Sequence, residues 1–588
     1  MRKRFNLMLL GAAVPILVIG GPMVARATTG SGLVTIGSPT LPFSQNKQNE
    51  PAMAVDANNT SIMVAGSNEE VDEQACSSQF PANPCPFTPG VGVSGVYFSF
   101  DSGKTWTQPS YTGYTARGCA ANFTTLVSAC AQTEGTIGTL PWYEENGIVS
   151  DGDPGLAFGP APGSNGGFSW SNGDRLYYSN LTSNFPGTGA FKGFEGIAVS
   201  RMDNPTSDSI AAKTSWKPPV VLSRQSNTTF SDKSQIWADN AATSHFFGNV
   251  YVCWAMFQGQ EISPFAAPAA LQVAVSHDGG STWTQHQISA AANNGQRQPP
   301  DGCTIRTDSQ GNAYVFGIGS VQSAGGQSFE LMSVSHNGGS TWSTPSPVVG
   351  PVFQPGIFDP VQGRPEIDGI TGARSDLAPA PSVDIANGAP TGADATDRFV
   401  MSYVSGFATA DERPQVYFTE STNHGVSWST PRAIQQAGDR GFYSAPAISP
   451  DGDTVYVVYN AFTTPYRANT SKPRDLVGVM LRASISGTAP TGAFSQLNSD
   501  IIGDARASSA NSQTSEFLGD YVYAVATRDV GAAVWNDTRN AQDCSAEDTY
   551  RENLVLGITP NPKPDPPTDC GSTSTFGNSD IYSFSTAT

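Results

Sequence analysis

SHDGGSTW, at residues 276–283, occurs four times in this chain with few changes. The other copies are SFDSGKTW at 99–106, SHNGGSTW at 335–342 and STNHGVSW at 421–428. An Asp or Asn side chain can accept hydrogen bonds from backbone N–H groups within a tight turn, and Gly tolerates a positive φ there. The stretch therefore predicts a turn between two strands, after which Trp opens the second strand and buries its ring.

Three positions of each copy are expected to build this turn: the polar third residue, the glycine and the tryptophan. They are Asp101, Gly103 and Trp106; Asp278, Gly280 and Trp283; Asn337, Gly339 and Trp342; and Asn423, Gly425 and Trp428. The apolar runs before the copies, such as GVYFSF and LQVAVS, are typical of strands.

A second, looser repeat consists of a polar start and a short apolar run, and a further apolar run follows it. Its copies are NEPAMAVD (49–56), GDPGLAFG (152–159), SDKSQIWAD (231–239), QPPDGCTIRTD (298–308), GRPEIDGI (363–370), YSAPAISPDG (443–452) and GDYVYAVA (519–526). Seven such units predict an all-β chain folded as a single β-propeller of seven four-stranded antiparallel blades, with six as the alternative. The last unit ends one strand short, so GLVTIGSPTLPF at 32–43 is expected to supply that strand and close the ring.

The repeated turn resembles the Asp-box, S-x-D-x-G-x-T-W, of the sialidase superfamily. Two copies match fully, whereas Asn337 and Asn423 replace the Asp of the others and Ser427 replaces a Thr. The resemblance implies a propeller with the box between the third and fourth strands of a blade, far from the active face. The box would then be a structural turn that identifies the fold and has no catalytic role.

The same resemblance implies candidates for the chemistry of a retaining exo-α-sialidase. Such enzymes use a Tyr nucleophile with a Glu partner, an Asp acid/base and three Arg that hold the substrate carboxylate. In this sequence the resemblance implies Tyr443 as the nucleophile, Glu366 as its partner and Asp153 as the acid/base. The three Arg would be Arg364, Arg440 and Arg539. The sequence departs from the family where its first Arg is expected, since blade one offers NEPAM, and in its number of blades, since sialidase domains have six.

Propeller geometry predicts a second set of residues, because the starts of the innermost strands converge around the axis on the face opposite the Asp-boxes. The ligand-binding candidates there are Glu50, Asp232, Lys233, Asp301, Asp520 and Asp537. Carboxylates with a few Arg suit sugars. No cofactor is expected, although the same oxygens could hold a calcium ion. Long insertions near Cys76–Cys85, at 107–150 and at 537–577 should lie on this face, where loops often carry binding residues.

Three functions fit these features. The first is a non-catalytic propeller that binds a glycan or an extracellular surface protein at its axial face. The second is the exo-α-sialidase, and the third is a glycosidase that uses a pair of carboxylates on polysaccharide. The five histidines lie in or near the turns or in an outer strand, which disfavours a Ser-His-Asp triad or a zinc site.

The net charge of −19 excludes nucleic acid as an expected partner, because phosphate binding needs a basic surface. The basic start, apolar stretch and Ala25-Arg26-Ala27 of residues 1–27 are typical of a secretory signal peptide, followed by an N-terminal segment at 28–44 and the propeller at 45–588. We therefore expect a bacterial, secreted monomer without a membrane span after cleavage. A membrane anchor at the N-terminus is the alternative.

An even number of cysteines in an exported chain indicates disulfides. The eight are Cys76, Cys85, Cys119, Cys130, Cys253, Cys303, Cys544 and Cys570. Pairing of nearest neighbours is one possible connectivity, and the spacing alone does not establish it.

Overall fold

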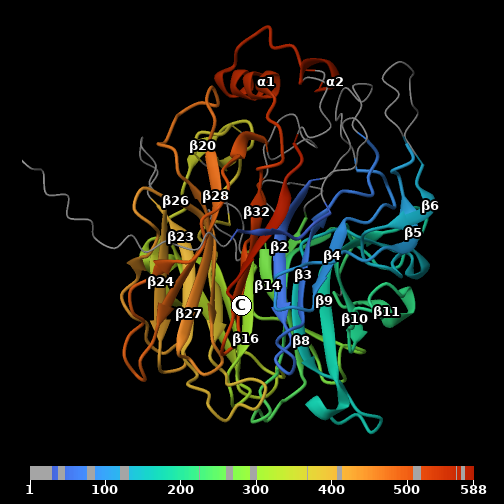
Figure 1. Ribbon diagram of the computed structural model, residues 1–588, viewed down its shortest axis with the longest axis vertical. Helices are drawn as coiled ribbons and strands as arrows, with labels where there is room; N and C mark the ends of the chain where they lie inside the picture. Colours follow the sequence, from blue (N-terminus) through green and yellow to red (C-terminus); the bar gives the residue numbers. More distant parts are fainter. Residues whose placement is uncertain are drawn as a thin grey trace, which may run out of the picture.

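The computed structural model describes residues 30–36, 47–75, 87–119, 131–223, 225–259, 269–291, 301–366, 368–371, 373–375, 377–406, 414–507, 518–564, 566–570 and 577–588. Seven antiparallel sheets form a ring (Figure 1). Their innermost strands contact one another in chain order, and the innermost strand of the seventh returns to that of the first. The seven-bladed propeller expected from the repeats is confirmed.

The blades have the following strands. Blade 1 is β2 (Gln48–Val55), β3 (Met63–Glu69) and β4 (Ser94–Ser99), with Thr107 bridging Phe98 on the outer edge. Blade 2 is β8 (Gly155–Pro160), β9 (Asp174–Asn184), β10 (Gly196–Asp203) and β11 (Trp216–Val221), with β7 (Ile148–Ser150) also pairing β9. Blade 3 is β12 (Thr229–Ala238), β13 (Val250–Gln258), β14 (Ala269–Ser276) and β15 (Thr284–Gln287). Blade 4 is β16 (Asp301–Thr307), β17 (Ala313–Val321), β18 (Gln327–Ser335) and β19 (Ser346–Val352). Blade 5 is β22 (Ser382–Ile385), β23 (Phe399–Ser405), β24 (Gln415–Ser421) and β25 (Arg432–Ala433). Blade 6 is β26 (Arg440–Ile448), β27 (Thr454–Phe462), β28 (Asp475–Ser484) and β29 (Ser495–Gln496), with β30 (Gly503–Asp504) also pairing β28. Blade 7 is β31 (Tyr523–Ala526), β32 (Gly531–Asp537), β33 (Asp580–Ser585) and β1 (Gly32–Leu33).

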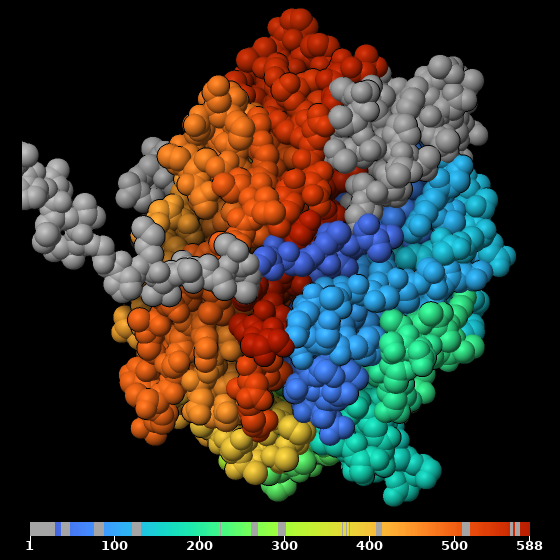
Figure 2. Space-filling view, viewed as in Figure 1, coloured from blue at the N-terminus to red at the C-terminus, as the bar shows by residue number. Residues whose placement is uncertain are grey.

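Strand β1 closes the ring, as the missing strand of the last unit predicted. Gly32 pairs with Ser583 and Leu33 with Tyr582, and the Val34 N–H donates to the Ile581 carbonyl at 2.9 Å. Residues 32–34 therefore lie against the C-terminal strand on the surface (Figure 2), whereas residues 37–43 of the expected strand lie outside the described residues. This pairing removes the open edge that β33 would otherwise present to other chains.

The Asp-box turns hold themselves together by local hydrogen bonds. In the copy at 276–283, Asp278 Oδ1 accepts from the backbone N–H of Thr282 at 2.9 Å, and the Thr282 hydroxyl donates to Oδ2 at 2.7 Å. In the copy at 335–342, Asn337 Oδ1 accepts the same backbone bond at 2.9 Å, but its amide donates to the Thr341 hydroxyl at 2.8 Å. Because the hydroxyl can donate or accept, Asp and Asn build the same turn.

The tryptophans of the boxes pack between blades. Trp283, Trp342 and Trp428 are half-buried, and each indole N–H donates at 3.1 Å to the carbonyl of the glycine in its own turn. Trp106 instead donates to the Ser583 hydroxyl at 2.9 Å, across the joint between blades 1 and 7. Each ring rests on the apolar cluster that its blade shares with the preceding blade.

The innermost strand of blade 5 differs from the expected one. The run at 363–370 was predicted to be this strand, but the sheet uses β22, at Ser382–Ile385. Residues 357–366 instead form the hairpin of β20 (Ile357–Asp359) and β21 (Arg364–Glu366), outside the blades. The prediction was wrong because a hairpin strand and a blade strand have the same local pattern, and only packing distinguishes them.

Two further insertions carry secondary structure outside the blades. The segment between blades 1 and 2 contains a hairpin of β5 (Tyr111–Thr115) and β6 (Thr133–Ile137). The segment that leaves β32 contains helices α1 (Ser545–Leu556) and α2 (Pro566–Asp569), at one end of the molecule (Figure 1). The buried residues of α1 are charged, namely Glu547, Asp548 and Arg551. For that reason the helix has no apolar stripe in the sequence.

Two disulfides join described residues. Cys253–Cys303 links β13 of blade 3 to β16 of blade 4, and Cys544–Cys570 closes the segment that holds α1 and α2. These are two of the four pairs that nearest-neighbour connectivity gives; the other two, 76–85 and 119–130, involve residues outside the described part of the chain. Cys119 is also disulfide-bonded, whereas Cys76, Cys85 and Cys130 lie outside the described residues, as does the expected signal peptide.

No helix within the described ranges has both the length and the apolar character needed to cross a membrane.

One buried carboxyl in blade 4 provides a test of the packing. The side chain of Glu330, on β18, is fully buried, and neither oxygen has a hydrogen-bond partner among the described residues. Burial raises the pKa of Glu330 well above its ordinary value. Below the ordinary pKa both the folded and the unfolded chain hold this proton. As the pH rises above that value, only the folded chain keeps it, so Glu330 lowers the stability of the fold.

The Glu330→Gln variant should therefore match the wild type at pH 4 and be more stable at pH 8, by about 1.4 kcal/mol for each unit by which burial raises the pKa of Glu330, because Gln has no proton to lose on unfolding. Urea unfolding at both pH values measures this difference. Glu134→Gln, at an exposed position on β6, is the control and should show no such pH dependence. Equal stability of wild type and Glu330→Gln at pH 8 would mean that Glu330 is solvated.

Candidate functional site

Several inner strands have an unusual backbone at the same level of the ring. Glu50, Asp153, Lys233 and Tyr443 have φ of 55, 51, 59 and 52°, a left-handed conformation that non-glycine residues rarely adopt. In β2, β12 and β26 the pairing register shifts at this point. Such bulges redirect a side chain, and each strained residue costs on the order of 1–3 kcal/mol. Strain of this kind persists only where the surrounding contacts hold it in place.

Lys233 is the centre of the contacts that these residues make. Its Nζ lies 3.0 Å from Glu50 Oε1, 3.1 Å from Asp153 Oδ2 and 2.8 Å from Asp520 Oδ2. The four residues come from blades 3, 1, 2 and 7, and their side chains are at most 7% exposed. The ammonium group therefore joins the inner strands of four blades across the axis.

Two more residues bind Asp520: Arg374 shares Oδ2 with Lys233, and Tyr443 binds the other oxygen. Arg374 Nη2 lies 2.7 Å from Asp520 Oδ2, and the Tyr443 hydroxyl donates to Asp520 Oδ1 at 2.6 Å. Glu50, Asp153, Lys233, Arg374, Tyr443 and Asp520 are called the axial cluster below. Arg374, with a side chain 28% exposed, is its one member that reaches solvent appreciably.

The charges of the axial cluster balance when one carboxyl keeps its proton. Burial and the neighbouring Asp153 raise the pKa of Glu50 well above its ordinary value. Burial opposes ionisation of Asp520 as well, but Arg374 and Lys233 more than offset it and hold its pKa below the usual range. Burial likewise disfavours the Lys233 ammonium, yet Asp153, Asp520 and Glu50 raise its pKa. Protonation of Glu50, which this shift favours, would leave two carboxylates facing two cations.

The three arginines assigned to a substrate carboxylate do not meet at this cluster. Arg440 donates from Nε to Asp368 at 2.7 Å, and Arg474 shares the same carboxylate. Arg364 lies in β21, outside the blades, and Glu366 lies in the same hairpin strand. The structure does not bring Arg364, Arg440 and Arg539 together.

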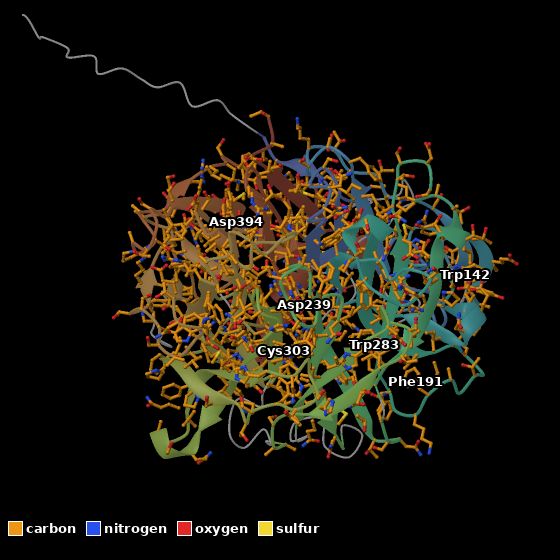
Figure 3. The ribbon with its side chains drawn as sticks, turned by 90° about the horizontal axis from the view of Figure 1, so that it is seen from below. Trp142, Phe191, Asp239, Trp283, Cys303 and Asp394 are labelled. Atoms are coloured by element: carbon orange, nitrogen blue, oxygen red, sulfur yellow. A yellow bond between two sulfur atoms is a disulfide. The ribbon has the colours of Figure 1, made fainter. Side chains whose placement is uncertain are left out.

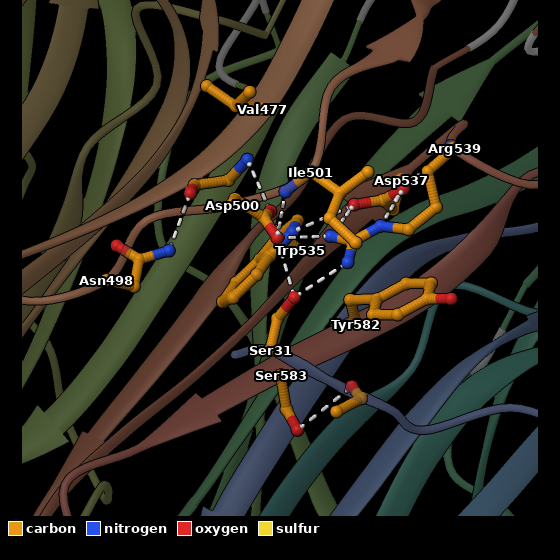
Figure 4. Close-up of polar contacts among 12 residues, drawn as sticks. Ser31, Val477, Asn498, Asp500, Ile501, Trp535, Asp537, Arg539, Tyr582 and Ser583 are labelled. Carbon is orange, nitrogen blue, oxygen red and sulfur yellow. Dashed lines mark hydrogen bonds and ion pairs between the residues drawn. The ribbon is translucent and has the colours of Figure 1, made fainter. Parts of the chain in front are cut away.

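Arg539 holds the closing strand in place, together with Asp537 (Figure 4). Its guanidinium donates to the Ser31 hydroxyl at 2.8 Å and to Asp537 Oδ2 at 2.6 Å, and it also pairs with Asp500 of blade 6. The guanidinium carbon lies 3.7 Å from the ring centre of Tyr582. This set of contacts joins β1, blade 6 and blade 7.

The remaining predicted residues are Asp232, which lies near the axis, and Asp301, whose side chain is not among the described ones. Asp232 is half-buried on β12 and close enough that its charge raises the pKa of Asp153. The backbone of Asp301 belongs to β16, opposite Ile318, but its side chain is outside the description. No group of three or more His, Cys, Asp or Glu side chains in the described ranges is placed to hold a metal ion.

Sequence reasoning missed Arg374 and Asn68. Arg374 lies in ITGARSD at 370–376, which has no strand pattern, and it reaches the axis from the insertion before blade 5. The Asn68 amide donates to Glu50 Oε2 at 2.7 Å, and its oxygen accepts from the Asp153 backbone at 2.7 Å. A signal for Asn68 was its position at the end of the second strand, on the same side of the blade as Glu50.

No protein-family model matches the chain, and no curated protein sequence matches it. Among solved structures, it is similar to the Hadza microbial sialidase Hz136, at 12% identity and a TM-score of 0.38, over 70% of this chain and 63% of that one. It is also similar to Trypanosoma rangeli sialidase in complex with sialic acid, at 11% identity and a TM-score of 0.39, over 87% and 73%. A leech intramolecular trans-sialidase aligns at 12% identity and a TM-score of 0.38, over 72% and 67%.

The alignment thus spans less than two thirds of the Hadza enzyme, and at these identities and TM-scores no activity transfers from any of the three. The seven blades and the Asp-box turns are properties of this chain itself. In its fold, the protein is a seven-bladed β-propeller with Asp-box turns.

Proposed function

We propose that the protein is an exported propeller that binds a carbohydrate on the face opposite its Asp-box turns, without the chemistry of a sialidase. The observation that carries this proposal is the separation of the arginines. Arg440 is paired with Asp368 and Arg539 with Asp500 and Asp537, whereas Arg364 lies in a hairpin. The resemblance requires three arginines for a substrate carboxylate, and Arg440 and Arg539 are each paired with other carboxylates.

The axial cluster supports binding rather than hydrolysis. Its carboxylates are buried and neutralised by Lys233 and Arg374, so they are poorly placed to give or take protons from a substrate. The cavity beside the cluster, lined by Tyr443, Asp520 and Cys303 among others, has a volume of only about 50 Å³. A ligand would instead contact the outer side of the cluster, where Arg374 is exposed.

Export is part of the same proposal. The basic and apolar residues at 1–27 support a signal peptide, and the two described disulfides accord with an oxidising compartment.

One contact favours a second function, that of an exo-α-sialidase. Tyr443 is hydrogen-bonded to a carboxylate at 2.6 Å, and a Tyr–carboxylate pair is the nucleophile that the resemblance implies, although the partner is Asp520 and not Glu366. Release of fluorophore from a fluorogenic sialoside, lost in Tyr443→Phe, would establish this second function and overturn the first.

A glycan array followed by titration calorimetry tests the binding. The Arg374→Gln variant should weaken binding of an array-positive glycan by tenfold or more, which corresponds to about 1.4 kcal/mol. Lys217→Gln is the control, because Lys217 is a partly exposed, ion-paired cation on the outer strand of blade 2. An array without any bound glycan, or equal affinity in wild type and Arg374→Gln, would contradict the proposal, and protein binding alone would favour a surface protein as ligand.

A further inference from the structure

A second cavity lies at the other end of the axis, on the Asp-box side. Its volume is about 190 Å³, and the ends of inner strands form its wall. Val55, Ile385 and Ile448 are such strand ends, and the chain turns after each of them toward the second strand of the blade. These turns lie on the same face as the Asp-boxes. Figure 3 views the molecule from that end, with Asp239, beside the lining residue Asn240, near the centre of the ring.

A polar layer separates this cavity from the axial cluster. Arg306 Nε donates to Asp384 Oδ1 at 3.1 Å, and Nη2 donates to the Tyr523 hydroxyl at 2.9 Å. That hydroxyl donates in turn to Gln235 Oε1 at 3.3 Å. Arg306 also stacks on Trp237, with its guanidinium carbon 4.6 Å from the ring centre. The layer forms the floor of the cavity and does not belong to the candidate site on the other face.

The floor has hydrogen-bonding capacity left over. Arg306 has five N–H groups and is 4% exposed, but only three of these groups donate to described residues, to Asp384, Tyr523 and the Ile305 carbonyl. Asn240 accepts from the Asn387 amide at 2.8 Å, whereas its own amide makes no hydrogen bond within the described ranges. A buried Arg donor without a partner is costly unless water or a ligand fills the site.

The wall combines apolar side chains with backbone groups. The apolar residues that line it include Met53, Leu156, Ile385 and Val525. Each inner strand pairs with a neighbour strand on one edge only, so N–H and C=O groups of its other edge face the axis. A cavity that is mostly apolar, with a few polar groups that converge, is typical of small-molecule sites.

The floor of the cavity is charge-balanced, because Arg306 is neutralised by Asp384. At the rim Arg528 pairs with Asp394 at 2.6 Å, and the remaining lining carboxylate, Asp529, is exposed to solvent. A charged ligand would therefore gain little here and would lose its hydration. A molecule with hydroxyl groups and an apolar face satisfies both the free donors and the apolar wall.

We propose that this Asp-box-side cavity is a second ligand site, which binds a neutral polyol of about the size of a monosaccharide. It is independent of the carbohydrate site proposed on the opposite face, because the layer of Arg306, Tyr523 and Gln235 closes the channel between them.

Ligand-observed NMR and titration calorimetry with glucose, galactose, N-acetylglucosamine and myo-inositol test the proposal. At least one of these probes should bind the wild-type protein, and Ala526→Phe should weaken that binding by tenfold or more, because Ala526 lines the cavity and is only partly buried. Ala393→Phe is the matched control, at an exposed position that does not line the cavity. Its affinity and melting temperature should equal those of wild type.

Three results would overturn the inference: no probe binds at millimolar concentration, binding survives in a folded Ala526→Phe variant, or only an anionic sugar such as glucuronate binds. Arg374→Gln separates the two sites. It should leave binding of the neutral probe intact, and loss of that binding in Arg374→Gln alone would assign the sugar to the opposite face.

Discussion

Replacing Lys233 by Met should destabilise the protein by about 3–5 kcal/mol at pH 7, the usual cost of removing one partner from a buried ion pair. Lys233 Nζ lies within 3.1 Å of carboxylate oxygens of Glu50, Asp153 and Asp520. Without the ammonium group these buried acids lose their main compensating charge, and the left-handed backbone of Glu50 and Asp153 loses a contact that holds it. Thermal and urea unfolding measure the loss.

The pH dependence of the variant identifies the cause. Without Lys233 the pKa values of the buried acids rise, so the folded variant takes up protons that the unfolded chain binds only at lower pH. The stability of Lys233→Met should therefore recover as the pH falls from 7 to 5, and the difference from wild type should shrink.

Lys217→Met is the control for Lys233→Met, since the Lys217 side chain is 39% exposed in its pair with Asp203 and should contribute less than about 1 kcal/mol. If Lys233→Met does not fold, the double variant with Asp520→Asn should regain part of the stability, because it removes one uncompensated charge. A single variant that unfolds like wild type at pH 7 would show that the axial cluster is solvated and not a buried joint between blades.

Replacing Arg539 by Ala should open the ring at its closing strand, at a cost of about 3–5 kcal/mol. The Arg539 side chain is 5% exposed, and its partners Asp500 and Asp537 are 1% and 3% exposed, so two buried carboxylates would lose their cation. Arg539→Lys keeps the charge but loses the forked hydrogen bonds and the stacking on Tyr582, so its stability should be intermediate.

Amide hydrogen exchange shows which part of the fold is destabilised when Arg539 is replaced. In Arg539→Ala, the Val34 amide, which bonds to the Ile581 carbonyl, should exchange faster than in wild type. Arg528→Ala is the control, because the Arg528–Asp394 pair is exposed by 35% and 47% and should matter little. Unchanged protection of Val34 alongside a lower melting temperature would place the effect of Arg539 between blades 6 and 7 and not at β1.

The repeats in the sequence were enough to predict the ring. An Asp or Asn, a Gly and a Trp at fixed spacing form hydrogen bonds within the turn itself. A turn such as 276–283 can therefore be predicted without knowledge of the rest of the chain. Counting the apolar pairs around these turns predicted seven blades, and a missing last strand predicted the pairing of the N-terminal segment with β33. The same count failed at blade 5, where β21 has the pattern of an inner strand and β22 does not stand out.

For the candidate site, the sequence by itself determined which residues begin the inner strands, and hence that Glu50, Asp153, Lys233, Tyr443 and Asp520 would converge. Only the tertiary structure decided their burial and their ion pairs: Lys233 is buried between three acids, and Arg374 lies at the edge of the cluster. It also decided that Arg440 and Arg539 hold insertions and the closing strand instead. The physical reason is the distance along the chain between the residues that interact. Turns and strand starts follow from neighbours in sequence, whereas the partner of a charged side chain is set by residues up to hundreds of positions away, which no local pattern records.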